Sequence, residues 1–555
     1  MTADPVPTTL PALFAQVVSR RGGQPAIVTG EETLDYRQLE RRSARLARAL
    51  LAAGAGKGTR IALLAPDGVF WVVGFLAALR IGALVTPVST LCTAPELAHI
   101  LRHGDVQMLI GARRFLRHDY GETLTAALPG LDTARAGALW LPAAPYLRAI
   151  WLDDSTGLPW ADGIENLLAR ADRPGVLAEV PENTLLAAVE QAVVASDPAV
   201  VIYTSGSTAQ PKAVVHCHWA LACHSPVLAR QFALHRDDRM MCLLPLFWLA
   251  GLSTMLQVLS VGATLVYPRS PAIGDALAMI SAAGVTRVNA WGDRQPALVA
   301  AAAKGGIDIT HIPDLGGFRT ADGELLPPRA AMYGMTESFS AHSAEPMDVP
   351  LPAGKAGSFG RAINGYERRV VDPLNGEEVA AGEIGELHIR GPALMTGFYK
   401  QPRQRVFTED GFYPTRDLVR IDADGFLYPA GRLDDMIKTR GANVSRLEVE
   451  AALVALPGVR AAAVAGLADP AAGQIVVAAV VPESGAQLCE QAMANALRQQ
   501  LSSYKVPRAM VLVSEDDIPR TATGKVKIAA LAGMIAARLA RAGRCPHEEN
   551  TVHVP

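Results

Sequence analysis

The sequence has few cysteines, few aromatic residues and almost no excess of charge. Six cysteines are spread over 555 residues, so no disulfide framework is expected and a reducing compartment is favoured. Lysine and arginine number 52 against 54 aspartates and glutamates. A balance this even gives no bulk attraction to nucleic acid or anionic lipid. The composition therefore argues against a disulfide-stapled secreted protein and against a nucleic-acid-binding protein.

The chain also lacks a clear targeting or membrane-spanning segment. Residues 1–21 contain an acid and prolines where a signal peptide needs an apolar core. Residues 70–88 are interrupted by a charge and a proline, whereas residues 247–267 are uncharged and long enough to cross a bilayer. Small and polar residues within this second stretch favour a buried helix followed by a strand. We therefore expect a cytoplasmic protein with no integral membrane segment.

What the chain does have is apolar sequence in alternating patterns. Half of the residues are hydrophobic, which allows large buried cores and excludes a disordered chain. Helical patterns at residues 10–17 and 39–53 alternate with short apolar strands at residues 26–28, 33–34 and 60–65. This alternation is typical of doubly wound α/β layers.

Later regions differ in character. Residues 126–198 show no chemical signature and are expected to pack on the surface or to join two lobes. From Ala199 the pattern predicts a strand, a glycine-rich loop and a helix. Short alternating strands at residues 357–397 indicate a small barrel or curved sheet, and a compact α/β unit follows Gly431. The predicted domains are residues 1–431, a hinge at 432–435, a C-terminal domain at 436–545 and a polar tail at 546–555.

A loop rich in hydroxyl groups follows the predicted strand at residues 199–202. Backbone amides, hydroxyls and a lysine after a strand can cradle a polyphosphate. The spacing differs from the Walker pattern, which disfavours a kinase or a P-loop GTPase. Taken alone, the loop is also compatible with a surface turn. The candidate phosphate-binding residues are Thr204, Ser205, Gly206, Ser207, Thr208 and Lys212.

Four further motifs follow in a fixed order. They are Tyr333-Gly334-Met335-Thr336-Glu337, then Phe412-Tyr413-Pro414-Thr415-Arg416-Asp417-Leu418, then residues 431–441, which read GRLDDMIKTRG, and finally Pro519-Arg520-Thr521-Ala522-Thr523-Gly524-Lys525. Together with the hydroxyl-rich loop, their order and composition resemble the adenylate-forming superfamily of acyl-CoA synthetases, luciferases and peptide-synthetase adenylation domains. The resemblance extends from about residue 10 to about residue 531.

The resemblance implies a fold and a reaction. The fold is α/β: a large N-terminal domain of two doubly wound α/β subdomains plus a small β-barrel-like subdomain, then a small mobile α+β C-terminal domain. The reaction is activation of a carboxylic acid by ATP to an acyl-adenylate, with release of pyrophosphate, followed by transfer to CoA. ATP, Mg²⁺ and CoA are then the cofactors, a small carboxylic acid is the partner, and fatty acid metabolism is one setting. A monomer and a homodimer are both left open.

The resemblance also implies roles for individual residues. The hydroxyl-rich loop would clasp the β- and γ-phosphates, Thr336 would contact the α-phosphate, and Lys525 would supply charge as the adenylate forms. For the nucleotide, the resemblance implies that Tyr333 stacks on adenine, that an adenine loop lies at Gly316 and Gly317 or at Asp322 and Gly323, that Asp417 binds the ribose and that Arg432 makes a second contact. It also implies that Glu337 binds Mg²⁺ and that Asp434 is the hinge. The thioester-forming face would carry Lys438, Arg440 and Gly441, with Gly441 lining the pantetheine tunnel.

The segment at residues 244–251 resembles the acyl-pocket motif of the family. Phe247 and Trp248 are its candidate pocket residues. Amino-acid-activating members place an aspartate after the phenylalanine, and a tryptophan cannot pair with a substrate ammonium, which is costly to bury unpaired. We therefore expect an acid without an α-amine, with aliphatic, alicyclic and aryl acids all open.

Several positions depart from the family pattern. Alanines stand at positions 209 and 213, and an arginine at position 416, where glycine is usual. The segment between residues 312 and 333 lacks a helix or a central strand, whose loss exposes unpaired backbone groups. Because of these departures, a family member that binds nucleotide or acyl groups without catalysis is kept as an alternative. For the acyl acceptor, the phosphopantetheine of a carrier protein is a second candidate beside free CoA. The His216, Cys217, His218, Cys223 and His224 cluster is assigned to packing on one helix rather than to zinc.

Overall fold

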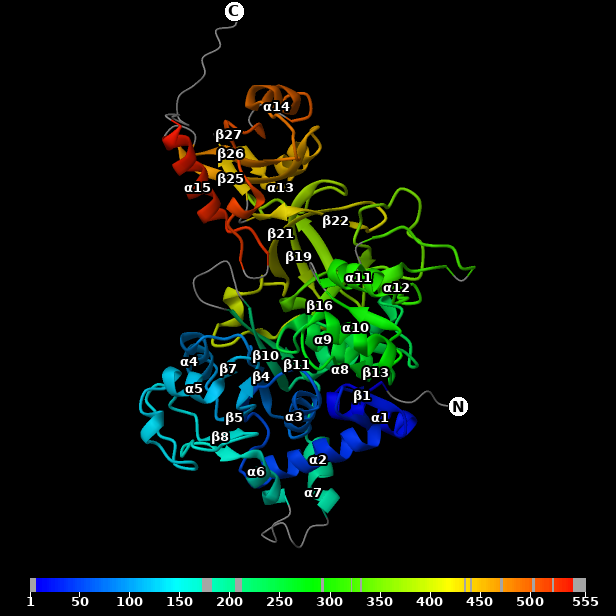
Figure 1. Cartoon of the computed structure of the whole chain (residues 1–555), viewed down its shortest axis with the longest axis vertical. Helices are drawn as coiled ribbons and strands as arrows, with labels where there is room; N and C mark the ends of the chain where they lie inside the picture. The colour runs from blue at the N-terminus through cyan, green and yellow to red at the C-terminus, as the bar shows by residue number, and fades with distance from the viewer. Residues whose placement is uncertain are drawn as a thin grey trace, which may run out of the picture. The chain divides into compact units, whose positions relative to one another are not determined.

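The computed structural model describes residues 6–171, 182–204, 212–290, 294–320, 322–329, 332–433, 436–439, 442–469, 473–501, 505–521 and 524–542. The chain divides into two compact units. The first comprises Met1–Glu367 with Arg390–Phe412, and the second Arg368–Ile389 with Tyr413–Pro555. The α/β expectation for the large N-terminal part is confirmed by two mixed sheets with helices in the first unit (Figure 1).

The first sheet is mostly parallel and carries the start of the hydroxyl-rich loop. Its strands run in the order β20-β11-β10-β4-β3-β5-β8-β9. The strands from β10 to β9 pair in parallel, whereas β11 pairs antiparallel with both β10 and β20. Their bounds are β3 (Arg60–Leu64), β4 (Leu84–Pro87), β5 (Met108–Gly111), β8 (Ala149–Leu152), β9 (Asp162–Gly163), β10 (Pro198–Thr204), β11 (Lys212–Cys217) and β20 (Gly397–Phe398).

The second sheet carries the acyl-pocket segment at one of its strand ends. Its order is β14-β12-β13-β1-β2, with parallel pairing except between β1 and β2. The bounds are β1 (Pro25–Val28), β2 (Thr33–Asp35), β12 (Arg239–Cys242), β13 (Thr264–Val266) and β14 (Arg287–Asn289). The predicted hairpin of β1 and β2 and the buried strand after residue 262 are both confirmed.

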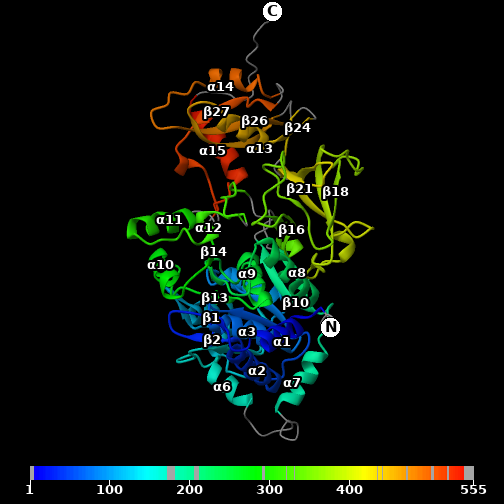
Figure 2. The same cartoon turned by 90° about the vertical axis from the view of Figure 1, so that its right-hand side faces the viewer.

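Helices cover these sheets according to their polarity. Helix α3 is apolar on all sides and almost wholly buried, as expected for a helix enclosed by other elements. Helix α2 is amphipathic and begins at a capping box of Asp35 and Gln38; it lies beside α3 and α6 (Figures 1 and 2). The helices are α1 (Leu10–Arg21), α2 (Tyr36–Ala52), α3 (Val69–Arg80), α4 (Ala94–His103), α5 (Tyr120–Ala127), α6 (Ile164–Ala171), α7 (Glu182–Gln191), α8 (His218–Gln231), α9 (Leu249–Val261), α10 (Ile273–Ala282), α11 (Arg294–Gly305) and α12 (Pro313–Gly316).

Two expectations for this unit are wrong. In the described part of residues 126–198, the expected surface connection is not found, because β8 is an internal strand and Leu131, Leu147 and Trp160 are buried in the core. The chain also does not pass directly from the hydroxyl-rich loop into a helix. Strand β11 comes first, since Val214 and Val215 are β-branched and buried against the neighbouring strands.

The shortened segment leaves β14 at the edge of the second sheet. A carboxylate covers part of this edge. Asp314 on α12 accepts the backbone N–H of Val288 at 2.9 Å and pairs with Arg287, whose guanidinium lies 2.8 Å away. Arg287 is 2% exposed and also donates to the carbonyls of Phe232 and Ala233. The sequence predicted unpaired backbone groups here, and the Asp314 side chain satisfies one of them, the N–H of Val288.

Smaller strands complete the first unit. They are β6 (Arg114–Phe115) with β7 (His118–Asp119), and a separate sheet of β15 (Met332–Met335), β16 (Ser340–Ala344) and β17 (Arg361–Ala362). Strand β15 pairs antiparallel with β16. The motif at residues 333–337 therefore begins in a small three-stranded sheet.

The second unit contains an antiparallel sheet and an α/β sandwich. The first sheet has the order β18 (Glu367–Val371), β19 (Ile384–Arg390), β21 (Tyr413–Ile421) and β22 (Leu427–Arg432). The second is built from β23 (Met436–Thr439), β24 (Ala442–Ser445), β25 (Val459–Asp469), β26 (Gly473–Pro482) and β27 (Ala509–Leu512). Its helices are α13 (Arg446–Val454), α14 (Glu490–Leu497) and α15 (Ile528–Arg541).

Alternation along β26 explains how these helices are divided between the two faces. Val476, Ala478 and Val480 pack in one core with residues of α13 and α14, whereas the intervening Val477 and Ala479 pack in another core with α15. A strand places successive side chains on opposite faces, so an apolar strand of this kind needs helices on both sides. The predicted C-terminal α/β unit is confirmed in these elements.

No helix among the described residues is long and apolar enough to span a membrane. The uncharged stretch at residues 247–267 instead forms α9 and β13.

Candidate active site

The two ends of the hydroxyl-rich loop lie opposite each other. Thr204 ends β10, Lys212 begins β11, and the two residues are direct partners in the antiparallel pair. The Thr204 hydroxyl donates to the carbonyl of Lys212 at 3.5 Å. The predicted phosphate ligands Ser205, Gly206, Ser207 and Thr208 lie outside the described residues, so the structure defines where their loop starts and ends.

An aromatic ring gives the ammonium of Lys212 a defined position. The Nζ atom lies 5.2 Å from the centre of the Phe398 ring on β20, a geometry in which a cation is attracted to the ring face. Strand β20 pairs with β11 at Val214. The lysine predicted to contact phosphate is thus placed at the entrance of the loop.

The motif at residues 333–337 makes a sharp backbone turn. Met335 ends β15, a 3₁₀ turn covers Thr336 to Ser338, and Phe339 follows at a φ of 47°. A Cβ at Gly334 would lie 1.9 Å from the carbonyl oxygen of Ser340, so only glycine fits there. The Tyr333 ring is half-buried and has edge contacts with His342 and Phe359 at 5.6 and 5.3 Å.

A buried histidine joins this motif to β11, the strand after the hydroxyl-rich loop. His216 Nε2 on β11 lies 2.7 Å from the carbonyl oxygen of Thr336. Burial lowers the pKa of His216 to about 4, so the ring is neutral and must carry its proton on Nε2 to donate to that carbonyl. The carbonyl of Glu337 accepts the N–H of Met395 at 2.7 Å. Thr336 and Glu337 are therefore fixed through their backbone.

The sequence interpretation missed this role of His216. It placed His216 and Cys217 on one helix with His218, whereas both belong to β11 and only His218 starts α8. A histidine just after a phosphate loop carries no distinctive spacing, so its contact with residue 336 could not be read from one sequence.

The predicted adenine loop lies at the end of α12. Gly316 ends this helix, and Gly317 follows at a φ of 92°. A Cβ on Gly316 would lie 2.6 Å from the carbonyl oxygen of Thr310. The described contacts place α12 against β14. A role for Gly316 and Gly317 in binding adenine remains a prediction.

The acyl-pocket segment connects β12 to α9. Phe247 is buried and Trp248 is 40% exposed, with their rings 5.6 Å apart at a steep angle. A Cβ at Gly251 would lie 2.2 Å from the carbonyl oxygen of Pro245, so the segment folds back tightly onto the start of α9. The segment presents one enclosed ring and one accessible ring side by side.

In the second unit, two residues taken from different motifs are direct neighbours. Asp417 on β21 faces Arg432 on β22 in the antiparallel register, and the Arg432 Nε lies 3.1 Å from Asp417 Oδ1. Asp417 is buried, and its backbone N–H donates to the Thr415 hydroxyl at 3.0 Å. Half of the Arg432 side chain remains exposed. This pair offers a carboxylate and a guanidinium at one position.

Arg416 occupies a backbone conformation that favours glycine. Its φ is 63°, in the left-handed region, although the residue lies within β21. Its N–H donates to the carboxylate of Glu386 at 3.0 Å. The departure from the family pattern at this position is therefore a conformational cost to the backbone as well as a larger side chain.

Lys525 lies at the tip of a tight hairpin. The N–H of Thr521 donates to the carbonyl of Lys525 at 2.7 Å, and Gly524 has a φ of 79°. The Lys525 side chain is exposed. Lys438 belongs to β23, opposite Asn443, whereas Asp434, Arg440 and Gly441 lie outside the described residues. The hinge and the thioester-forming face remain predictions.

The described side chains do not form a metal cage. No group of three or more histidine, cysteine or acidic side chains that could hold an ion occurs in the described ranges. His224 instead bonds to the carbonyl of Ala341 at 2.8 Å. A single carboxylate such as Glu337 suits Mg²⁺ that arrives on a nucleotide, because this ion keeps phosphate and water ligands.

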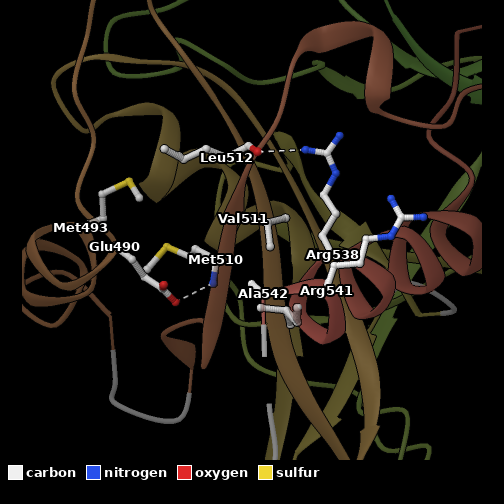
Figure 3. A pocket seen from close by; sticks show the side chains of 9 residues that line it. Glu490, Met493, Met510, Val511, Leu512, Arg538, Arg541 and Ala542 are labelled. Carbon is white, nitrogen blue, oxygen red and sulfur yellow. Dashed lines mark hydrogen bonds between the residues drawn. The ribbon is translucent and has the colours of Figure 1, made fainter. Parts of the chain in front are cut away.

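A separate hollow of about 670 Å³ opens in the C-terminal sandwich (Figure 3). Met493 and Met510 contribute apolar atoms, while the Arg538 guanidinium donates to the carbonyl of Leu512 at 3.1 Å and pairs with Asp517 at 2.9 Å. Its lining contains none of the predicted site residues. The hollow is therefore separate from the predicted chemistry.

Comparisons with known proteins agree with the motif order. The model of the AMP-binding enzyme family matches residues 14–399, and that of the AMP-binding enzyme C-terminal domain matches residues 448–525. A 4-coumarate–CoA ligase-like protein of Oryza sativa subsp. japonica is 30% identical, covering 85% of this chain and 82% of its own length. A feruloyl-CoA synthase of an Amycolatopsis species is 29% identical, covering 90% of this chain and 94% of its own.

A solved structure is similar over the same extent. The Mycobacterium tuberculosis fatty acyl CoA synthetase matches with a TM-score of 0.67 and 25% identity, covering 96% of this chain and 99% of that chain. The family models together reach from the start of the first unit to the Lys525 hairpin. This chain belongs to the AMP-binding, adenylate-forming enzymes, in their acyl-CoA ligase branch.

Proposed function

We propose that this enzyme activates a carboxylic acid without an α-amine, of aliphatic, alicyclic or aryl type, and transfers it to CoA. The general reaction is that of an ATP-dependent acid–CoA ligase acting through an acyl-adenylate. The choice of acid rests on residues 244–251. Phe247 and Trp248 offer aromatic surface, and Trp248 has no charge with which to pair an ammonium.

The observation that best supports nucleotide binding is the Asp417–Arg432 pair. The two residues were assigned to the nucleotide from separate motifs, and they face each other across β21 and β22 at 3.1 Å. The carboxylate of Asp417 can accept from two ribose hydroxyls, and the Arg432 guanidinium lies beside it. A buried carboxylate repels an anionic ligand but can accept hydrogen bonds from a neutral diol such as a ribose.

In the first half-reaction, a carboxylate oxygen of the acid attacks the α-phosphorus of ATP. The bond from that phosphorus to the bridging oxygen breaks, and pyrophosphate leaves with the electron pair of that bond. Lys212 and the hydroxyl-rich loop hold the departing phosphates, while Thr336 donates to the α-phosphate. Lys525 supplies positive charge as the anhydride forms. Glu337 would hold a Mg²⁺ ion, whose charge would offset that of the phosphates.

In the second half-reaction, the thiol sulfur of CoA attacks the acyl carbon. The acyl–oxygen bond breaks, AMP leaves with both electrons, and the thiol proton passes to water. This step uses the face of the C-terminal domain that carries Lys438 and Gly441. Rotation about Asp434 would exchange this face for the Lys525 hairpin between the two steps.

A panel of carboxylic acids tests this proposal directly. Exchange of labelled pyrophosphate into ATP should depend on the acid, and CoA should convert the accumulated adenylate to AMP and a thioester. Aryl, aliphatic, alicyclic and α-amino acids form the panel, and α-amino acids should give the lowest exchange. Formation of ADP and phosphate would contradict the reaction, and preferential activation of an α-amino acid would contradict the pocket assignment.

Two alternatives give different results in the same assay. A protein that only binds nucleotide would take up ATP, as measured by calorimetry, without exchange across the whole panel. A carrier-protein ligase would exchange pyrophosphate but form thioester on a phosphopantetheinyl carrier protein much faster than on free CoA.

A further inference from the structure

An acidic side chain links the two large sheets next to the acyl-pocket segment. Asp67 lies between β3, in the first sheet, and α3. Its Oδ1 atom accepts the backbone N–H of Leu246 at 2.8 Å. Leu246 follows β12, which belongs to the second sheet. Because β3 and β12 both pair in parallel with their neighbours, this contact lies where the carboxyl ends of strands from two sheets meet, a usual position for ligand sites in α/β folds.

The contact fixes the residue that comes immediately before the two pocket aromatics. Other bonds hold the segment on either side. The N–H of Leu243 donates to the carbonyl of Asn289 at 2.9 Å, and the N–H of Trp248 donates to the carbonyl of Pro245 at 3.0 Å. The Asp67 carboxylate thus holds the middle of the segment, where the direction of Phe247 is set.

Asp67 is exposed to solvent, although protein atoms pack around its carboxyl. Partial desolvation by these neighbours raises the pKa of the carboxyl, and the bond from the Leu246 N–H lowers it. The groups that face it electrostatically are Cys242 at the end of β12 and Tyr267 after β13. Burial raises the pKa of Cys242 to about 12 and that of Tyr267 above its usual range, so both are neutral near pH 6.

We propose that Asp67 is a positioning residue for acid binding, which holds Leu246 so that Phe247 and Trp248 keep the geometry of the acyl pocket. This inference rests on the proposed role of residues 244–251 in binding the acid. Asp67 itself need not touch the substrate, since its effect passes through the backbone of Leu246.

Two substitutions at position 67 separate the hydrogen bond from the volume of the side chain. Asp67→Asn keeps an oxygen that accepts the N–H of Leu246, whereas Asp67→Leu has similar size and no acceptor. In pyrophosphate exchange at saturating ATP, Asp67→Leu should raise the KM for the acid about tenfold or more. Its KM for ATP should stay within about twofold of the original, and Asp67→Asn should keep both constants close to those of the original enzyme.

Two outcomes would contradict the role proposed for Asp67. An unchanged KM for the acid in Asp67→Leu would overturn the proposal. Equal increases in the KM values for acid and ATP would indicate general damage to the domain and would overturn it as well.

Fluorescence tests the positioning role without turnover. The emission of Trp248 is obtained as the difference between the original protein and Trp248→Phe. It should shift between pH 8 and 4.5 as the carboxyl of Asp67 gains its proton, and Asp67→Asn should lack this shift. The same titration in both proteins would overturn the proposal.

These two measurements also separate the inference from the proposed function. If the original protein shows no acid-dependent exchange with any acid, the proposed function fails, and the fluorescence titration still decides whether Asp67 controls the segment. If exchange is normal and both Asp67 variants behave alike, only the inference fails.

Discussion

At the scale of single residues, Arg416 in the candidate site has a strained backbone conformation that lowers the stability of the fold. A residue other than glycine loses about 1–2 kcal/mol of stability when its backbone is in the left-handed region. Arg416 has a φ of 63°, within that region. Its neighbour Asp417 holds Arg432. The chain thus keeps the Asp417–Arg432 pair next to a strained residue at a position where the family usually has glycine.

This strain leads to a prediction for stability. Arg416→Gly should raise the free energy of unfolding by about 1 kcal/mol, because the relief of strain exceeds the entropy that glycine loses. Arg416→Ala is the matched control, since it removes the guanidinium and keeps the strain. Urea unfolding midpoints measure both. A stability gain in the alanine variant equal to that in the glycine variant would assign the effect to the side chain instead.

His216 allows a second prediction at this scale. Its neutral ring donates to the carbonyl of Thr336 at 2.7 Å. His216→Phe leaves that buried carbonyl without its donor, at a cost of about 1–3 kcal/mol, and should raise the KM for ATP more than the KM for the acid. His216→Gln offers an N–H donor and should recover part of the ATP affinity. Steady-state exchange assays at varied ATP provide the measurement; equal KM values in the Phe and Gln variants would contradict the positioning of Thr336.

At the scale of elements, the junction of β11 and α8 carries histidines that stay neutral. Burial lowers the pKa of His216, His218 and His224 to about 4 in each case. In the unfolded chain, histidines take up protons near pH 6.5. The contribution of these three histidines to the free energy of unfolding is therefore complete above that pH. The stability they contribute is lost as the pH falls from about 6.5 towards 4.

Acid should therefore destabilise the first unit at pH values above the usual pKa of aspartate and glutamate. Between pH 7.5 and 5 each histidine should cost on the order of 2 kcal/mol, which urea midpoints at the two pH values would show. His216→Gln should reduce this pH dependence. His235→Gln is the control because His235 is exposed, and a similar reduction in that variant would contradict the assignment.

The edge of the second sheet gives a prediction about the missing strand. Asp314→Ala removes the nearer carboxylate of the buried Arg287 guanidinium and the acceptor for the N–H of Val288, while Asp238 stays 3.8 Å from the guanidinium. Leaving the Val288 N–H and part of the guanidinium without acceptors costs about 1–3 kcal/mol, so the variant should unfold at lower urea. Asp308→Ala is a nearby control, because Asp308 is exposed and bonds within its own turn to Thr310. Equal losses in both variants would show that Asp314 has no special role at this edge.

At the scale of the whole molecule, the two half-reactions should depend on different faces of the C-terminal domain. Lys525→Ala should slow adenylation about 100-fold, because in the proposed reaction this exposed lysine supplies positive charge for that step. Gly441→Leu should leave adenylation near its original rate and block thioester formation. Pyrophosphate exchange and CoA-dependent AMP release measure the two steps separately. Equal loss of both steps in both variants would contradict alternation of the domain.

Much of this molecule is readable from local sequence. The helix at residues 10–21, the hairpin at 25–35 and the buried α9 follow from apolar periodicity, capping residues and turns. The family assignment followed from the order of five motifs. The core role of residues 126–198 was not readable, because a short apolar run such as β8 looks the same at a surface as inside a sheet.

The sequence by itself determined the α/β class, the family and the residue types available for holding ATP. Tertiary structure decided which of these residues meet, because contacts between distant segments depend on strand order and register. It placed Asp417 opposite Arg432, joined His216 to Thr336, covered the edge of β14 with Asp314 and brought Asp67 to Leu246. Each of these contacts joins separate elements of the fold, and no local pattern encodes it.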